Sequence, residues 1–318
     1  MSNTKFNRCL MAAVALMLSL LVSLNISVDP YGVFGTSGLP DGPSSNERFI
    51  KIQHTIDENV GYELLLFGSS RSGMTDPAWF EQATGLRSYN LSVFSGRPRD
   101  MEKLYAAYKK THTGPKRVVV GLDAMSFLLE GDDTDLSRRH HPSADDASRI
   151  SYWLDYLLAP SILPSMEKVT NRKRPTIVFD WAAGTYSLKH YERLIAENHQ
   201  AYMDEKFGTW TPRQLSAELD AREWEALSRW LAVLQRDNVE ITIFLQPMHR
   251  QWRARMAPLM KDLEPLLQSV AGLVDLSHLE SDNDAVWYEQ RHYREPVARS
   301  VVDALFGASA QIAIAQRP

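Results

Sequence analysis

The sequence is poor in cysteine and lacks the common nucleotide-binding motifs. It has a single cysteine, Cys9, which excludes an intrachain disulfide and a cysteine-rich metal site. The phosphate-binding motifs G-x-x-x-x-G-K-[ST] and G-x-G-x-x-G are both absent. His140 and His141 precede Pro142 in a charged segment and lack the helical spacing of a zinc site. We therefore expect neither a cofactor nor a metal ion.

An excess of basic residues is also missing. The chain has 318 residues and a formal net charge of −4, so its composition indicates no nucleic-acid partner. Hydrophobic residues make up 44% of the chain, which is enough to bury a sizeable core without disulfides. Length alone is compatible with one large domain or two small ones.

Charged residues are absent from residues 9–28, a run about long enough to cross a bilayer as a helix. Lys5 and Arg8 precede this run, and the first basic residue after it is Arg48. The asymmetry predicts a single-pass protein of the inner (cytoplasmic) membrane, with a cytoplasmic N-terminus and a periplasmic or otherwise extracytoplasmic main domain. We expect residues 1–28 to form an uncleaved anchor, because no convincing A-x-A site follows the run. A cleaved signal peptide and a buried core helix are the alternatives.

Beyond the anchor, turn-forming glycines and prolines mark residues 29–60 as a connector to the main domain, residues 61–318. The predicted strands of that domain are 64–67, 88–93, 117–122, 239–245 and 272–276. The predicted helices are 99–110, 223–236, 253–270 and 295–306. This alternation predicts an α/β fold with a parallel sheet between two layers of helices.

Residues 127–220 interrupt the alternation of strands and helices. They are rich in tryptophan, tyrosine and charged residues, and their pattern indicates mostly helix and loop. We expect a helical insertion that caps an edge of the sheet. Ordinary helical packing is the alternative.

One short segment presents a serine directly after the first predicted strand. Ser70 lies in the sequence Gly68-Ser69-Ser70-Arg71-Ser72-Gly73. If the chain turns into a helix here, a nucleophilic hydroxyl lies beside backbone N–H groups that can stabilise an oxyanion. The competing interpretation is that Ser69 or Ser70 only caps the next helix.

A histidine with a carboxylate nearby lies ahead of the last predicted helix. Glu289 precedes His292 by one turn of helix, and Asp282 and Asp284 are alternative acids. The acid would orient the imidazole, and the imidazole would take the proton of Ser70, as in acyl-transfer and ester-hydrolysis enzymes. The alternative is a surface histidine flanked by arginines.

Further candidates follow predicted strands, whose carboxyl ends meet at one edge of a parallel sheet. Gly96 would offer a second N–H to the oxyanion, or it is a plain turn glycine. Asp123 is either a site residue or a helix cap. His249 would contact the substrate or cap a helix, and Arg71 would hold an anionic group or pair with Asp76.

The order of these segments resembles the SGNH (GDSL-like) hydrolase superfamily. The resemblance runs over about residues 62–307 and rests on Gly68-Ser69-Ser70, Gly96, Gly121-Leu122-Asp123 and Glu289-x-x-His292. It implies a flavodoxin-like three-layer α/β/α sandwich with Ser70 as nucleophile, His292 as base, Glu289 as acid and Gly96 as oxyanion donor. The chain is most similar to the membrane-anchored, extracytoplasmic branch, whose members acylate bacterial cell-envelope polysaccharides.

Three positions depart from the family pattern. Ser69 and Asp123 stand where the family has an aspartate and an oxyanion-binding asparagine, and Glu289 replaces an aspartate. An ionised Asp123 would repel an oxyanion.

The resemblance implies a serine esterase or O-acyl (acetyl) transferase that acts on cell-envelope or exported polysaccharide, with a membrane acyltransferase or export complex as partner. The alternative, which Asp123 favours, is a catalytically silent scaffold that binds glycan or a membrane partner.

Overall fold

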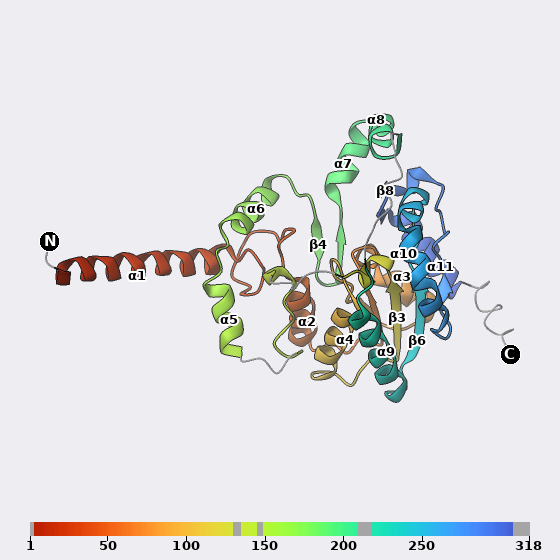
Figure 1. Cartoon of the computed structure of the whole chain (residues 1–318), viewed down its shortest axis with the longest axis horizontal. Helices are drawn as coiled ribbons and strands as arrows, with labels where there is room; N and C mark the ends of the chain where they lie inside the picture. The colour runs from red at the N-terminus through yellow and green to blue at the C-terminus, as the bar shows by residue number, and fades with distance from the viewer. Residues whose placement is uncertain (1–2, 130–134, 145–148, 209–217, 308–318) are drawn as a thin grey trace.

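A parallel five-stranded sheet forms the centre of the protein (Figure 1). The computed structural model describes residues 3–129, 135–144, 149–208 and 218–307. The strands are β1 (Leu64–Gly68), β2 (Ser88–Asn90), β3 (Arg117–Leu122), β6 (Glu240–Leu245) and β7 (Val274–Asp275). Their order is β2-β1-β3-β6-β7, and each neighbouring pair is parallel. The predicted α/β class is therefore confirmed.

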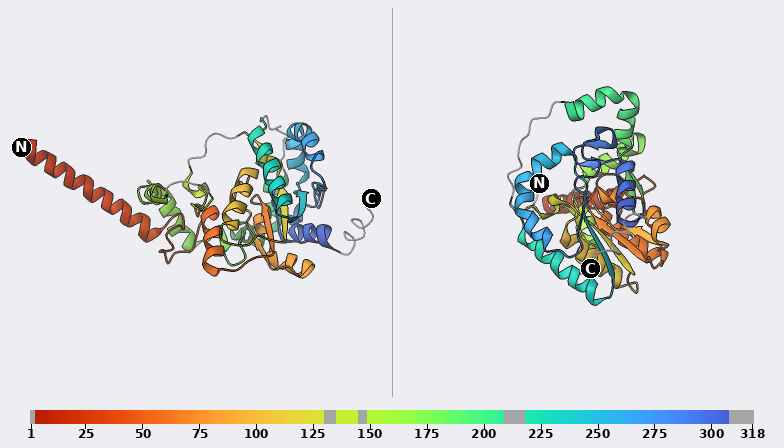
Figure 2. Two further views of the ribbon diagram at one scale, coloured as in Figure 1. Left: turned by 90° about the horizontal axis from the view of Figure 1, so that it is seen from below. Right: turned by 90° about the vertical axis from the view of Figure 1, so that its right-hand side faces the viewer.

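Helices cover both faces of this sheet (Figures 1 and 2). One face, which includes Leu65 and Phe67, packs against α2 (Glu47–Glu58), α4 (Pro98–Lys109), α9 (Ala221–Arg236) and α10 (Arg250–Gln268). The other face, which includes Leu64 and Leu66, packs against α3 (Pro77–Thr84) and α11 (Glu295–Phe306). The central strands β1 and β3 are almost entirely apolar and buried, as expected for strands that helices cover on both faces.

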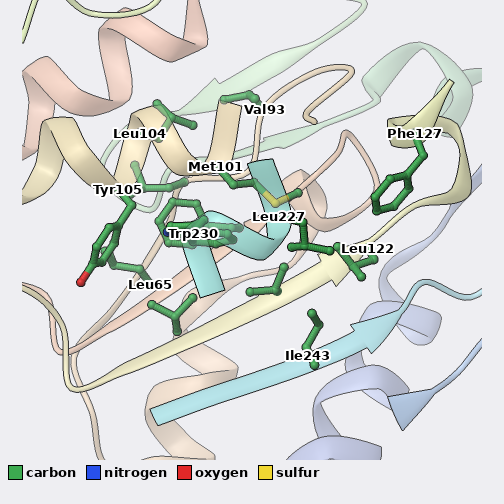
Figure 3. Close-up of a cluster of buried hydrophobic side chains, with 14 of the residues drawn as sticks. Leu65, Val93, Met101, Leu104, Tyr105, Leu122, Phe127, Leu227, Trp230 and Ile243 are labelled. Atoms are coloured by element: carbon green, nitrogen blue, oxygen red, sulfur yellow. The ribbon is translucent and has the colours of Figure 1, made fainter. Parts of the chain in front are cut away.

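The larger core lies between the sheet and helices α4 and α9 (Figure 3). Trp230 of α9 is fully buried, and its ring centroid lies 5.0 Å from that of Phe67 and 6.2 Å from that of Tyr105. Such contacts between large aromatic rings contribute more than the burial of their area alone. Helix α9 begins at Ala221, because the side chain of Asp220 accepts a hydrogen bond from the first turn.

The apolar helix α1 (Asn3–Val28) projects away from the rest of the protein (Figures 1 and 2). At about 1.5 Å per residue its 26 residues extend about 39 Å, more than the roughly 30 Å of a hydrocarbon core. Its most apolar window has a mean hydropathy of 2.3 and is only 6% buried. The helix is thus long and apolar enough to cross a membrane, and the alternative of a buried core helix is wrong.

The segment predicted to be a connector is only partly irregular. Asp29 has a φ of 46°, and its carboxylate accepts hydrogen bonds from the N–H groups of Val33, Phe34 and Gly35, which closes a tight loop. From Glu47 onward the chain forms α2, whose residue Ile52 is part of the main core. The glycines and prolines ahead of α2 hid this amphipathic helix from the sequence pattern.

Residues 127–220 hold a β-hairpin that the sequence pattern did not predict. The described elements here are η3 (Leu136–Arg138), α5 (Arg149–Leu157), α6 (Ile162–Lys173), β4 (Val178–Asp180), β5 (Thr185–Ser187), α7 (Lys189–Glu197), α8 (His199–Met203) and the π-helical turn η4 (Asp204–Gly208). The hairpin docks on the edge strand β2. The Asn90 N–H donates to the Ala183 carbonyl at 3.2 Å, and the Tyr89 hydroxyl donates to the Trp181 carbonyl at 2.8 Å. It thereby covers an edge that would otherwise be open.

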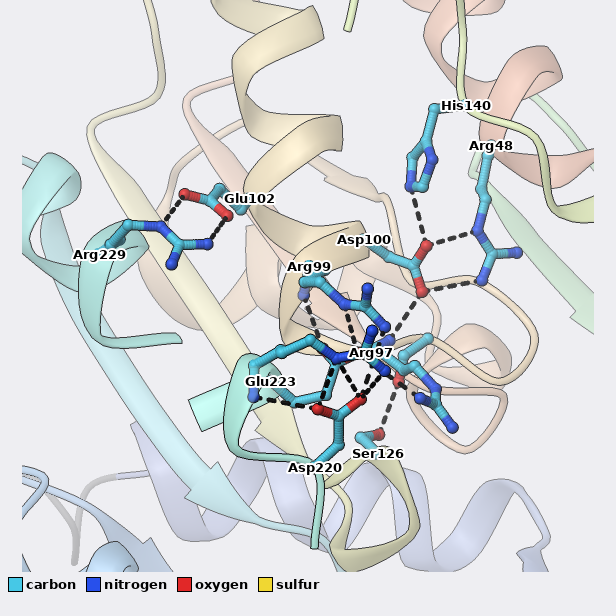
Figure 4. A network of polar contacts seen from close by, with 12 residues as sticks. Arg48, Arg97, Arg99, Asp100, Glu102, Ser126, His140, Asp220, Glu223 and Arg229 are labelled. Carbon is cyan, nitrogen blue, oxygen red and sulfur yellow. Dashed lines mark hydrogen bonds and ion pairs between the residues drawn. The ribbon is translucent and has the colours of Figure 1, made fainter. Parts of the chain in front are cut away.

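A network of buried charges holds the start of α4 (Figure 4). The carboxylate of Asp100 accepts two hydrogen bonds from Arg48, at 2.7 and 2.9 Å, and one from the Arg97 N–H at 2.9 Å. His140 lies 2.8 Å from the same carboxylate. Burial acts to raise the pKa of Asp100, but Arg48 and His140 together hold it well below its usual range.

We expect Asp100→Asn to lower the free energy of unfolding by about 3 kcal/mol, because it leaves the buried Arg48 without its counter-charge. The matched control is Glu102→Gln on the same helix. Its carboxylate pairs with Arg229 at 3.1 Å, but that guanidinium is 56% exposed, so the cost is below about 1 kcal/mol. Chemical denaturation followed by circular dichroism measures both variants, and equal losses would contradict the role given to Asp100.

The depressed pKa of Asp100 also predicts a pH dependence. A carboxyl with a lowered pKa in the folded state stabilises the protein above its unfolded pKa, about 3.9, and this stability is lost as the pH falls further. The wild-type protein should therefore lose more unfolding free energy than Asp100→Asn between neutral pH and about pH 3. Parallel losses in the two proteins would assign the acid sensitivity to other carboxyls.

Candidate active site

Ser70 lies at the carboxyl end of β1, where the order of the sheet reverses. The next two strands in the chain, β2 and β3, lie on opposite sides of β1. The loops that follow β1 and β3 therefore run in opposite directions, and in parallel sheets such a point leaves a crevice between the loops. A three-residue 3₁₀ helix, η1 (Ser72–Met74), follows Ser70, and the next α-helix begins only at Pro77. The helix expected directly after Ser70 is thus a single 3₁₀ turn, and the α-helix follows it.

His292 approaches Ser70 on a β-hairpin, formed by β8 (Trp287–Glu289) and β9 (His292–Tyr293) after the short helix η5 (Asp284–Val286). The Ser70 Oγ lies 3.0 Å from His292 Nε2, and His292 Nδ1 lies 2.5 Å from the Oε1 atom of Glu289. The predicted partners are thus adjacent, but Glu289 and His292 meet across a hairpin and not along a helical turn. The carboxylate can only accept, which selects the tautomer with the proton on Nδ1 and leaves Nε2 to accept from Ser70.

Of the candidate acids, Glu289 is the one that contacts His292. Burial acts to raise the pKa of Glu289, but the hydrogen bond from His292 and the charge of Arg291 bring it below its usual range. Asp284 instead accepts from His249 at 2.9 Å and from Arg250 at 2.5 Å. An ionised acid behind the imidazole stabilises the imidazolium that forms when His292 takes a proton.

Asp123 forms a buried ion pair next to Ser70. Its Oδ2 atom lies 3.3 Å from the Nε of Arg71 and accepts a hydrogen bond from the Ser69 hydroxyl at 3.1 Å. Its Oδ1 atom accepts from the Met125 N–H at 3.0 Å, at the start of η2 (Ala124–Phe127). The alternative pairing of Arg71 with Asp76 is wrong, since Asp76 caps α3. Both oxygen atoms of the Asp123 carboxylate are thus engaged, and the contacts of Oδ2 with Ser69 and Arg71 tie the loops after β1 and β3 together.

Gly96 allows two loops to approach closely. A Cβ atom at Gly96 would collide with the carbonyl oxygen of Gly68 at the end of β1. In this structure the Gly96 N–H donates to the Val93 carbonyl at 3.0 Å, and Gly96 does not line the pocket at Ser70. The Gly96 N–H is therefore not free to act as the predicted oxyanion donor in this structure, because it is hydrogen-bonded within the turn.

His249 is a second predicted site residue that does not line the Ser70 pocket. Its side chain is fully buried, and its ring packs against Phe207 and Trp287, with centroids at 4.8 and 5.6 Å. It also caps α10 by accepting from the Gln251 N–H. Burial lowers the pKa of His249, although Asp284 opposes the shift. The capping interpretation holds, because no part of His249 lines the pocket.

A pocket of about 100 Å³ opens at Ser70 and His292. Its lining is mostly polar and includes three arginines, and it consists of Ser69, Ser70, Arg71, Ser95, Arg97, Asp123, Met125, Ser126, Arg291 and His292. Sequence reasoning missed Arg97 and Ser126, which no motif marks. It named Arg291 only as a neighbour of the histidine. Among the described residues, no three His, Cys, Asp or Glu side chains are grouped to hold a metal ion.

Tyr186, in the insertion, was also missed. Its hydroxyl donates a hydrogen bond to the backbone carbonyl of Ser70, and its ring lies against Gly73, where a Cβ would collide with it. The ring also meets Phe94 with centroids 4.6 Å apart. Burial raises the pKa of Tyr186 well above its usual value, so the hydroxyl remains a donor. Only the folded hairpin β4–β5 brings this residue to the site, and its local sequence carries no signal.

We expect Asp123→Asn to destabilise the protein by about 3 kcal/mol and to slow any reaction of Ser70, because the buried Arg71 loses its counter-charge. The matched control is Asp76→Asn, in which asparagine caps α3 about as well as aspartate does. For both variants we would measure chemical denaturation and the rate at which a fluorophosphonate probe reacts with Ser70. Faster labelling of Asp123→Asn would show instead that position 123 faces the oxyanion and that an amide serves there better.

A comparison of the chain with protein-family models and with curated proteins finds no match.

Proposed function

We propose that this protein is a serine esterase or O-acyl transferase of the SGNH type, with Ser70 as nucleophile. The observation that carries the proposal is the continuous relay of Ser70, His292 and Glu289, with contacts of 3.0 and 2.5 Å. Serine is a weak nucleophile at neutral pH and needs an adjacent base that is itself oriented by a third group. This arrangement supplies both.

In the proposed reaction, the Ser70 oxygen attacks the carbonyl carbon of an ester while His292 Nε2 takes the hydroxyl proton. The ester C–O bond then breaks, and His292 returns the proton to the departing alcohol, which leaves an acyl group on Ser70. Water or a sugar hydroxyl attacks this acyl group and gives its proton to His292, which returns it to Ser70. The two acceptors correspond to hydrolysis and transfer.

The negative oxygen that forms during attack needs nearby positive charge or N–H donors. The Ser70 N–H and the guanidinium groups of Arg97 and Arg291 would supply them, since both arginines line the pocket. Arg97 and Arg291 would thus stabilise the oxyanion in place of the Gly96 N–H. The small volume of the pocket, about 100 Å³, favours a short acyl group such as acetyl.

The fold supports the same family. Numbered by their order in the chain, the five strands have the order 2-1-3-4-5, which is the order of flavodoxin-like sheets. We propose a flavodoxin-like three-layer sandwich over residues 61–318, tethered by an anchor at residues 1–28. The basic residues Lys5 and Arg8 favour a cytoplasmic N-terminus, with the main domain on the other side of the inner membrane.

This location would bring the site to exported or cell-envelope polysaccharide, the substrate class that we propose. A membrane acyltransferase or an export complex would then be the partner that supplies or accepts the acyl group. A catalytically silent scaffold is the second candidate, and one observation favours it. The Gly96 N–H donates to the Val93 carbonyl, so the second oxyanion donor that the family resemblance implies is occupied.

A fluorophosphonate probe tests the nucleophile directly. We expect a single adduct on the wild-type protein by intact mass, none on Ser70→Ala, and labelling about 10²–10⁴-fold slower on His292→Ala. Ser69→Ala is the matched control and should still form the adduct, because the Ser69 hydroxyl donates to Asp123. A folded wild-type protein that takes up no probe would overturn the enzyme proposal and leave the scaffold.

A further inference from the structure

Helix α6 buries three polar side chains and exposes its large apolar ones, which share the outer face with Glu167 and Thr170. Its buried residues are Ser165, Lys168 and Asn171. The face turned to the surroundings carries large apolar side chains that are 46–76% exposed, namely Ile162, Leu163, Met166 and Val169. A helix on the surface of a water-soluble domain has the opposite arrangement, with its apolar stripe facing the core.

Two of the three buried polar residues of α6, Lys168 and Asn171, have polar partners within the protein. The Lys168 Nζ donates to the Asp29 carbonyl at 2.6 Å and lies 3.0 Å from the Asp41 carboxylate. The Asn171 side-chain amide donates to the Asp41 carbonyl at 3.0 Å. These contacts fix which side of α6 faces the protein, so the exposure of its apolar side is built into the fold.

Helix α5 carries a second exposed apolar row. Tyr152 and Tyr156 are buried in a small aromatic cluster with Val33 and Phe49, on the side of the main domain. Ile150, Leu154 and Leu158 are exposed, repeat every fourth residue, and are offset by two positions from the buried pair. This offset places them on the opposite side of the helix, away from the domain.

Helices α5 and α6 both contact the C-terminal end of α1. The side-chain amide of Asn25 is buried and donates to the carbonyls of Tyr156, Leu157 and Ala159, at 3.1, 2.9 and 3.0 Å. The Ser161 hydroxyl donates to the Asn25 carbonyl oxygen. The turn between α5 and α6 therefore packs on the last turns of α1. From this point the two helices extend to opposite sides, crosswise to α1 (Figure 1).

We propose that α5 and α6 lie in the interface of the bilayer that α1 crosses and form a lipid-facing collar around the end of the anchor. The collar consists of the exposed side chains Ile150, Leu154, Leu158, Ile162, Leu163, Met166 and Val169. This inference rests on the proposed membrane placement of α1. Helices that cross α1 at its end lie parallel to the membrane plane, and their free apolar sides then enter the boundary between headgroups and acyl chains.

The charge at the end of α6 supports a lipid surface as the partner that contacts the collar. Arg172, Lys173 and Arg174 are consecutive and exposed at the C-terminal end of the helix. An apolar helix face bordered by basic residues is typical of helices that lie on anionic membranes. The collar would hold the main domain at a set orientation, whereas one membrane helix alone would leave it free to swing.

Fluorescence quenching in proteoliposomes tests the collar with the full-length chain. The sole cysteine is first removed by Cys9→Ser, and single cysteines are introduced by Leu154→Cys and Leu163→Cys and labelled with bimane. The lipids are an anionic mixture with or without a nitroxide group near the headgroups. We expect the nitroxide lipid to lower the bimane fluorescence at both positions by about half, as for a side chain about 5–10 Å inside the interface.

Two further positions make each outcome decisive. Gln235→Cys on α9 is the matched exposed control and should keep its fluorescence. Leu16→Cys in α1 should be quenched by a nitroxide placed deep in the acyl chains. Quenching at position 16 without quenching at positions 154 and 163 would support the anchor but overturn the collar. The exposed apolar side chains would then be assigned to contact with a protein partner. No quenching at 16 would overturn the anchor and the collar together, while labelling of Ser70 reports independently on the enzyme proposal.

Discussion

The buried guanidinium of Arg71 joins the ends of the three central strands. Arg71 itself follows β1, its Nε lies 3.3 Å from Asp123 after β3, and its Nη1 donates to the Pro247 carbonyl after β6 at 3.0 Å. A buried charge without such partners would cost several kcal/mol, so the loops are held where they satisfy it. Ser70 is the residue directly before Arg71, and its position in the turn follows from this constraint.

The base of the relay is held to the same strand ends. Tyr293, next to His292, is fully buried, and its hydroxyl donates to the side chain of Gln246 after β6 at 3.0 Å. Gln246 in turn donates to the Ser72 hydroxyl, just beyond Ser70. The hairpin that carries the histidine and the turn that carries the serine are therefore joined through one buried hydrogen-bond chain. In the proposed reaction, such support would keep Ser70 and His292 in place before a substrate binds.

The insertion links the site to the anchor. Its hairpin brings Tyr186 to the backbone carbonyl of Ser70, and its helices α5 and α6 pack on α1 through Asn25. A single stretch of chain thus contacts both the membrane-length helix and the candidate nucleophile.

The sequence by itself determined the α/β class, the apolar anchor-length helix and the pair of Ser70 and His292, because periodicity and local residue order carry that information. It did not determine the hairpin geometry of Glu289, the pairing of Asp123 with Arg71 or the arrival of Tyr186. Each of these joins segments that are distant in the chain or depends on which turn the chain makes. Local propensity cannot select among such partners, and the tertiary structure decided them through the cost of leaving buried polar groups unpaired.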